Sequence, residues 1–201
     1  MVNMGEVLIV NGIGVFHYSK GNLFTRAAGQ EAHLHWERLF TAMILLTILG
    51  LTSEAMSFLI DGTRFPGSRV LNILLNTLCF LSSSTLGYLW CLFTEFRIFN
   101  NLQRVRKTTF RLLPTLLLMY ILCLVNLKNG IFFTVSPENV YRRGRLIVVP
   151  YLVVFFDYFY TLCLNDISRK SGLHLHTMSP LTFVGPCIVG TVIQGMCYGI
   201  T

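Results

Sequence analysis

Five polar side chains set within long apolar runs are the residues of this sequence best suited to binding a ligand. They are Glu54, Asn72, Asn76, Asn126 and Gln194. Each such group is costly in lipid and usually faces a polar partner or a cavity. The spacing of Asn72 and Asn76 places both on one face of a helix. All five are expected at a similar depth, so they predict either a polar pocket, with Glu54 as its only charge, or a hydrogen-bonded cluster that joins helices.

The other residues capable of chemistry do not combine into a catalytic or metal site. Asp157 lies deeper in its apolar run, where it would pair with a basic loop residue or contact Tyr160 and Trp90. His-Leu-His occurs at 33–35 and 174–176, but no acidic residue or cysteine completes a ligand set at a defined spacing, so we expect no bound metal. The six cysteines form no C-x-x-C pair. No nucleotide-binding, nucleophile-elbow or zinc-protease motif is present, so we expect neither enzyme activity nor a cofactor.

The composition requires a membrane around most of these residues. The chain of 201 residues is 53% hydrophobic and only 12% charged. An ordinary soluble domain has about 25% charged residues. The apolar residues also occur in runs long enough to cross a bilayer, which takes roughly 20 residues of helix. The sequence therefore predicts a polytopic membrane protein with the lipid bilayer as its surroundings.

The apolar runs define the expected fold. Five are clear and a sixth, over the first residues, is shorter and more polar: they span 39–60, 71–94, 112–133, 146–164, 178–201 and 2–19. No linker or repeat separates them. We expect an all-α transmembrane bundle of about six helices that forms a single domain over residues 1–201. Gly195 and Gly199 form a G-x-x-x-G pattern, which predicts close helix packing in the last run.

The loop between the runs 112–133 and 146–164 has a structure of its own. Two β-prone runs, 131–135 and 139–143, flank a turn that contains Pro137. This pattern predicts a short β-hairpin. The hairpin either covers helix ends or closes a ligand site, in which case Arg142 or Arg143 would compensate the charge of the acidic residue in the polar layer.

The basic residues predict the orientation in the membrane. Alternate loops, containing 20–38, 97–111 and 169–170, hold more Lys and Arg than the loops containing 64–69 and 128–145. The positive-inside rule then places the first set in the cytoplasm and the N-terminus and hairpin outside. Basic loops beside anionic headgroups account for the net charge of +7, so no nucleic-acid partner is implied.

Several short motifs carry a resemblance to a known family. They are D-G-x-x-F-P-G at 61–67, L-L-N-T-L at 74–78, Leu89-Trp90, and G-x-F-F…N-V-Y-x-R-G over 130–144. The segments 57–99 and 129–162 closely resemble the N-terminal seven-transmembrane sensor region of bacterial diguanylate cyclases (GGDEF proteins). Related regions precede some histidine kinases. The family's seventh helix and its cyclase domain with the G-G-D-E-F signature have no counterpart in these residues.

The resemblance implies a sensor module in a bacterial inner membrane. Such a module would bind a small extracytoplasmic ligand, or respond to the state of the membrane, and regulate a cytoplasmic diguanylate cyclase. Dimerisation is implied through the C-terminal part that these residues lack. The resemblance does not identify the signal, because the ligands of this family are largely undefined. The alternatives are a small transporter or carrier, which would have a site near the membrane midplane, and a structural membrane subunit, in which the polar layer only joins helices.

Overall fold

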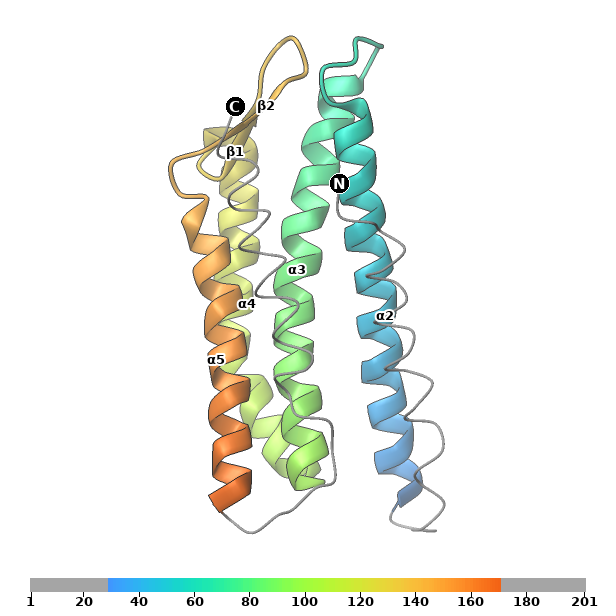
Figure 1. Ribbon diagram of the computed structural model, residues 1–201, viewed down its shortest axis with the longest axis vertical. Coiled ribbons are helices and arrows are strands. Elements are labelled where there is room, and N and C mark those ends of the chain that lie inside the picture. Colours follow the sequence, from blue (N-terminus) through green and yellow to red (C-terminus); the bar gives the residue numbers. More distant parts are fainter. Residues whose placement is uncertain (1–28, 171–201) are drawn as a thin grey trace. The chain divides into compact units, whose positions relative to one another are not determined.

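The computed structural model describes residues 29–170, which form four helices and one two-stranded hairpin (Figure 1). In chain order the elements are α2 (Gly29–Ile60), α3 (Ser68–Phe99), α4 (Leu102–Asn129), β1 (Phe133–Val135), β2 (Tyr141–Arg143) and α5 (Val148–Lys170). The chain divides into two units, Met1–Leu34 and His35–Thr201. All contacts given below lie within the second unit. The helices expected at 2–19 and 178–201 fall outside the described residues.

All four described helices have a segment that is long and apolar enough to cross a membrane. These segments are Glu37–Ile60, Ser68–Phe99, Leu102–Asn129 and Val148–Ser168. Large apolar side chains such as Leu45, Leu59 and Leu124 are exposed on them, as on helices that face lipid. The described part of the chain therefore supports the prediction of a polytopic helical membrane protein.

Several helix boundaries differ from the expected runs: α2 begins at Gly29 instead of 39, α4 ends at Asn129 instead of 133, and α5 extends to Lys170 instead of 164. Helix α3 continues to Phe99 and α4 already begins at Leu102, so the basic stretch around 102–111, expected in a loop, is helical. Asn101 explains the early start, because its side-chain oxygen accepts hydrogen bonds from the backbone N–H groups of Gln103 (2.9 Å) and Arg104 (3.1 Å) and caps the helix. The hydropathy of the sequence does not reveal this early start of α4, because the basic side chains around 102–111 extend the helix beyond its apolar run.

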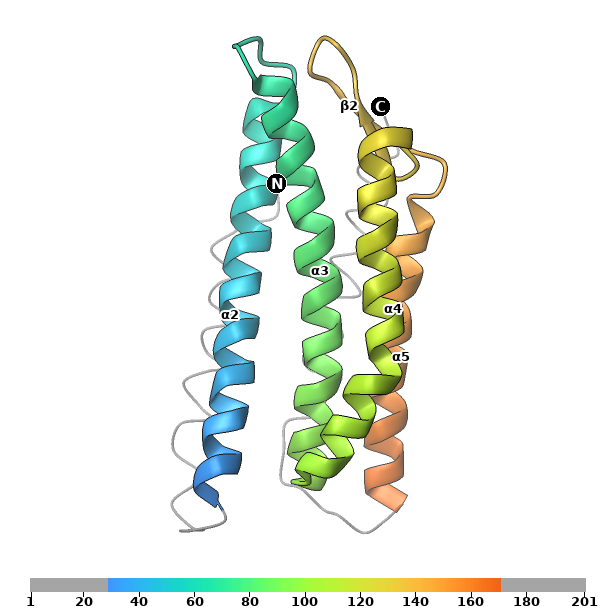
Figure 2. The ribbon, with the colours of Figure 1, turned by 180° about the vertical axis from the view of Figure 1, so that it is seen from behind.

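Helix α3 is the central element of the described bundle. It packs along both α4 and α5, and it also contacts β1. Figure 1 and the opposite view in Figure 2 both show α3 between α2 and the α4–α5 pair. Helix α4 contains Pro114 and bends partway along its length (Figure 2). Proline causes such a bend because it removes one backbone hydrogen bond and its ring clashes with the preceding turn.

Several helix hydroxyl groups bond to the backbone of their own helix. Thr47 donates to the carbonyl of Met43 and Ser84 donates to that of Phe80, each at 2.8 Å. Thr161 donates to the carbonyl of Asp157 at 3.0 Å. Lipid offers no alternative partner, so these bonds satisfy groups that would otherwise be costly.

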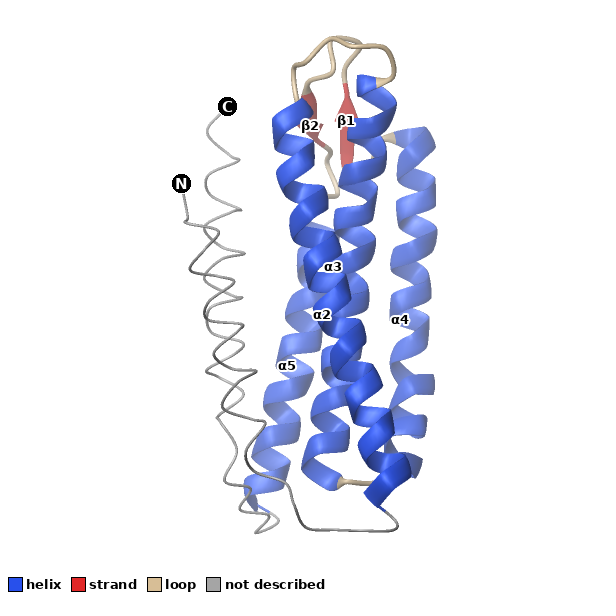
Figure 3. Cartoon of the chain, turned by 90° about the vertical axis from the view of Figure 1, so that its right-hand side faces the viewer, coloured by secondary structure: helices blue, strands red, loops and turns tan. Residues whose placement is uncertain are grey.

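The expected hairpin is present and lies at one end of the bundle (Figure 3). β1 and β2 pair antiparallel, with Phe133 opposite Arg143 and Val135 opposite Tyr141. The β1 side chains Phe133 and Val135 are buried and pack with Met119 of α4 in the main apolar cluster. Hydrophobic burial therefore fixes the hairpin on the helix ends. We call this the hairpin end of the bundle, and the end with the α3–α4 turn the turn end.

Candidate functional site

Four polar side chains from three parts of the chain meet at the hairpin end. Asn72 of α3 donates from Nδ2 to Asp61 Oδ1 (3.0 Å) and to Asn139 Oδ1 (3.1 Å). Asn76, one turn further along α3, donates to Asn72 Oδ1 at 2.7 Å. Asn72 is 0% exposed. We call these four residues, Asp61, Asn72, Asn76 and Asn139, the amide clasp.

The amide clasp closes the end of α2 onto the hairpin. Asn139 lies in the hairpin turn with a left-handed backbone (φ 63°), a conformation that Asn tolerates better than most residues. Its side-chain amide donates to the carbonyls of Ile60 (2.6 Å) and Thr63 (3.0 Å) where α2 ends, and the Ile60 carbonyl also accepts from the backbone N–H and the hydroxyl of Thr63. Asp61 Oδ1 also accepts from the backbone N–H of Tyr141 at 2.8 Å. These contacts hold the end of α2, the start of α3 and the hairpin together, which is a structural role.

Residues of the first and the last sequence motif lie together in the amide clasp. Asp61 belongs to the first motif, and Asn139 and Tyr141 belong to the last. Gly144, at the end of the last motif, lies so close to the backbone of Ile131 that an added Cβ would overlap the Ile131 carbonyl. Packing and hydrogen bonding therefore account for these motif residues.

Asn126 has a separate structural role. It is buried near the end of α4, and its Oδ1 accepts from the backbone N–H groups of Phe132 (2.7 Å) and Phe133 (3.1 Å). These contacts hold the chain where it leaves α4 and enters β1. Asn126 does not line the cavity described next.

A cavity of about 250 Å³ lies beside the amide clasp, between α2, α3, α5 and β2. We call it the Glu54 cavity. Its polar lining includes Glu54 and Ser57 of α2, Asn76 of α3, and Tyr141 and Arg143 of β2. The remaining described lining residues are Leu46, Thr47, Gly50, Leu51, Cys79, Phe80, Ser82, Ser83, Ser84, Leu86, Pro150, Tyr151 and Val154. A mixed apolar lining with a few convergent polar groups is typical of a small-molecule site.

The Glu54 cavity contains both signs of charge and a fixed hydrogen-bond donor. Glu54 enters from α2 and Arg143 enters from the hairpin. Burial, and next the proximity of Tyr151, raise the pKa of Tyr141 to about 12. The Tyr141 phenol therefore stays protonated at neutral pH. The arrangement suits a small polar molecule with apolar parts, and no catalytic constellation is formed by these lining residues.

The predicted site residues thus have different surroundings. Glu54, Asn76 and Arg143 line the cavity, while Asn72 lies in the adjoining clasp. Arg142 is exposed on the opposite side of its strand, as the alternation of a β-strand requires. Gln194 lies outside the described residues. Sequence reasoning missed Tyr141 and the clasp residues Asp61 and Asn139, because it considered only polar residues within the apolar runs.

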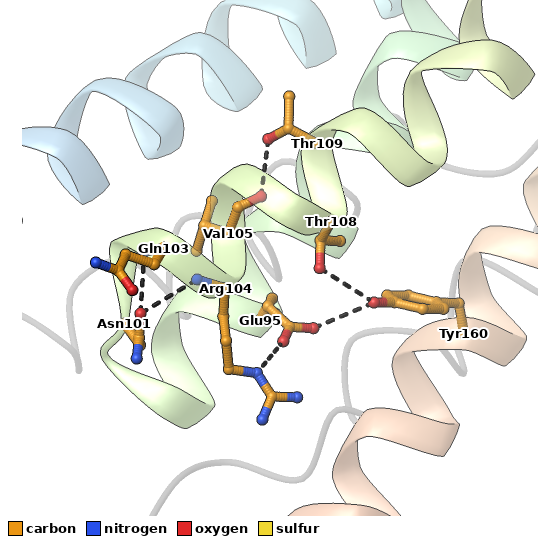
Figure 4. A network of polar contacts seen from close by, with 8 residues as sticks. All are labelled: Glu95, Asn101, Gln103, Arg104, Val105, Thr108, Thr109 and Tyr160. Atoms are coloured by element: carbon orange, nitrogen blue, oxygen red, sulfur yellow. Dashed lines mark hydrogen bonds and ion pairs between the residues drawn. The ribbon is translucent and has the colours of Figure 1, made fainter.

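A second polar cluster, at the turn end, contains an acidic residue that the sequence reasoning passed over. Glu95 is buried, and its Oε1 accepts from Arg104 Nε at 2.8 Å (Figure 4). Its Oε2 accepts from the Tyr160 hydroxyl at 3.2 Å, and that hydroxyl lies 3.5 Å from Thr108 Oγ1. Glu95 follows the expected run 71–94 by one residue, so a longer window would have included it.

Asp157 does not take the basic partner that the sequence suggested. Within residues 29–170 the Tyr160 hydroxyl and the Arg104 guanidinium bond to Glu95 instead. No three His, Cys, Asp or Glu side chains of the described part gather as metal ligands. The histidines at 174 and 176, and the side chains at 33 and 35, fall outside what the structure describes.

Comparisons of the chain with models of known protein families, with curated protein sequences and with solved structures gave no match.

Proposed function

We propose that this chain is a membrane sensor domain that binds a small ligand in the Glu54 cavity. The observation that supports the proposal is the lining of that cavity, in which Glu54, Asn76 and Arg143 come from three separate elements. A ligand that contacts all three would favour one arrangement of α2, α3 and the hairpin over another. A ligand can shift an equilibrium only through such a difference in affinity between two states.

The resemblance to the sensor regions of diguanylate cyclases supplies the proposed output. The domain would regulate a cytoplasmic cyclase joined to its C-terminal side, and two copies would associate through that part. α4 bends at Pro114, but none of the four described spans is broken into the half-helices that are common at transporter sites. This continuity supports a sensor over a carrier.

The proposed setting is the bacterial inner membrane, with the N-terminus and the hairpin outside. Single cysteines at positions 103 and 138, placed in a background without the native cysteines, test the orientation in intact cells. A membrane-impermeant thiol reagent should label position 138 and leave position 103 protected. The reverse pattern would overturn the orientation.

The functional test is a chimera that joins the chain to the seventh helix and cyclase domain of a family member. Glu54→Gln should leave expression and thermal stability unchanged and alter cyclic di-GMP production, because it removes the acidic charge from the cavity. Glu138→Gln is the matched control, since Glu138 lies exposed in the hairpin turn and does not line the cavity. Output should respond to the first change only.

The structural-subunit alternative predicts a different result from the same variants. If Glu54 only joins helices, Glu54→Gln should change stability by about 0.6 kcal/mol, an average value for membrane hydrogen bonds, and leave cyclase output unaltered. That outcome would refute the sensor site.

A further inference from the structure

Asp157 presents a buried carboxylate for which the described residues offer no counter-charge. It lies on α5 and is only 4% exposed. Within residues 29–170 the Asp157 carboxylate makes no hydrogen bond or ion pair. The backbone oxygen of Asp157, by contrast, accepts hydrogen bonds from Cys91 Sγ and Thr161 Oγ1. Leaving an ionised carboxylate unpaired in a low-dielectric interior costs several kcal/mol. The site is therefore stabilised either by a proton on the carboxyl group or by a positive partner.

Gly87 of α3 makes the room into which this carboxylate fits. A Cβ added at Gly87 would lie 2.5 Å from Asp157 Oδ2. Any other residue at this position would displace the Asp157 side chain from the interface between α3 and α5. The carboxylate is therefore held at a defined place in the middle of three packed helices.

A small cavity of about 10 Å³ adjoins the carboxylate and has mixed polar and apolar walls. Asp157 shares its lining with the hydroxyl-bearing residues Ser84, Tyr88 and Thr115, and with Leu112, Leu116 and Val153. Its volume is about that of one water-sized sphere. The cavity, which we call the Asp157 cavity, thus has space for one water molecule or one small ion.

Two of the three hydroxyl groups of the Asp157 cavity donate their protons to backbone carbonyls and can therefore offer only oxygen lone pairs. Ser84 donates its proton to the carbonyl of Phe80 (2.8 Å), and Tyr88 donates to that of Thr109 at 3.5 Å. The groups that face Asp157 from α3, α4 and α5 include no Lys, Arg or His. A carboxylate surrounded by neutral oxygen ligands is complementary to a hard cation.

We propose that the Asp157 cavity binds one small monovalent cation of the size of Na⁺. The Asp157 carboxylate is the charged ligand, and the hydroxyl oxygens of Ser84, Tyr88 and Thr115 are neutral ligands. One carboxylate balances one positive charge, which favours a monovalent over a divalent ion. The bound ion would link α3, α4 and α5, independently of the Glu54 cavity.

Thermal unfolding of the purified full chain in detergent tests the proposal, with NaCl exchanged for choline chloride at constant ionic strength. Choline is too large for the cavity. A ligand that binds only the folded state stabilises it by mass action, so the midpoint should rise by several degrees with NaCl and then saturate. Asp157→Asn should abolish this rise. Asp166→Asn is the matched control, because Asp166 is exposed on the same helix, and it should retain the rise.

Two further measurements keep the proposal testable if Asp157→Asn fails to fold. Thr115→Val keeps the carboxylate and removes one neutral ligand, so the NaCl concentration at half-saturation should increase several-fold. Radioactive Na⁺ should bind saturably to the unaltered chain. A midpoint that does not depend on NaCl, an equal dependence in Asp157→Asn, or no saturable Na⁺ binding would overturn the proposal and leave a cavity that holds only water.

Discussion

Arg104 and Glu95 form an ion pair in which only one partner is buried. Arg104 Nε lies 2.8 Å from Glu95 Oε1, and the two side chains are 46% and 2% exposed. Arg104→Ala leaves a buried carboxylate with only the Tyr160 hydroxyl, whereas Glu95→Gln leaves a guanidinium that can turn to water. We therefore expect Arg104→Ala to cost more. The difference should be about 1 kcal/mol rather than the 3–5 kcal/mol of a fully buried pair, because solvent screens Arg104.

Denaturant unfolding of the purified variants in detergent measures this order. The double variant Glu95→Gln/Arg104→Ala should be no less stable than Arg104→Ala, because the uncompensated charge is then absent. If Glu95→Gln lowers the stability more than Arg104→Ala does, the Arg104 guanidinium does not serve to compensate the buried Glu95 carboxylate.

Gly87→Ala should destabilise the bundle by about 1–3 kcal/mol, the usual cost of overpacking. Its Cβ would lie 2.5 Å from Asp157 Oδ2, so the buried Asp157 side chain must move within its packed surroundings. Adding Asp157→Ala to this variant should recover part of the loss, because it removes the opposing atoms. Gly50→Ala is the matched control, since its Cβ would lie 3.5 Å from Ser82 Cβ, an ordinary contact. Thermal unfolding of the four proteins measures the effects, and an equal cost at Gly50 and Gly87 would contradict the argument.

Asn139→Ala should destabilise the hairpin end by about 1–3 kcal/mol, because it removes several hydrogen bonds that are each worth roughly 0.5–1.5 kcal/mol net. It removes the donors to the carbonyls of Ile60 and Thr63 and the acceptor for Asn72. Hydrogen exchange of the backbone amides of Gly62 and Tyr141 should accelerate, because both bond to the amide clasp.

Asn100→Ala separates this effect from the cost of the left-handed backbone. Asn100 also has a positive φ (44°) but ends α3 at the turn end through its backbone N–H. The change should therefore cost only the backbone strain. Comparable losses in the Asn100 and Asn139 variants would show that the side-chain amide of Asn139 contributes little.

The raised pKa of Tyr141 predicts a loss of stability in strong alkali. Its pKa is about 12 in the folded chain against an ordinary value of 10.0. The folded state therefore holds this proton more tightly, and the resulting stability is complete below about pH 10 and is lost as the pH rises toward 12. Near-ultraviolet titration of the chain and of Tyr141→Phe measures the ionisation. The titration curve of Tyr141→Phe should lack one tyrosine that ionises near pH 12. If the variant instead lacks a tyrosine that ionises near pH 10, the prediction is wrong.

The periodicity of the sequence was sufficient to predict the local elements. Long apolar runs indicated the four described helices, and two β-prone runs around Pro137 indicated the hairpin that the structure contains. The four-residue spacing of Asn72 and Asn76 placed them on one helix face, where they are hydrogen-bonded to each other. These features depend on neighbours within one or two turns.

The partners of the polar residues could not be predicted in the same way. Asn72 bonds to Asn139, 67 positions away, and only the course of the chain through the bundle brings them together. Asn126 is expected in the same polar layer as Glu54, but it faces the backbone of Phe132 and Phe133 instead of the cavity. Hydropathy reports how apolar a segment is, and it does not indicate the direction in which a side chain points.

The bond between Asn139 and Ile60 also has a consequence for the biogenesis of the protein. The two residues are 79 positions apart, and α3 and α4 lie between them in the chain. A ribosome therefore completes and releases the first two described helices long before the hairpin residue that closes them exists. During that interval the carbonyl of Thr63 and the side-chain amide of Asn72 lack their bonds to Asn139, and water or an insertion factor at the membrane surface can take its place. Nascent chains halted before residue 139 should thus insert their helices and still be open to proteases at 61–67.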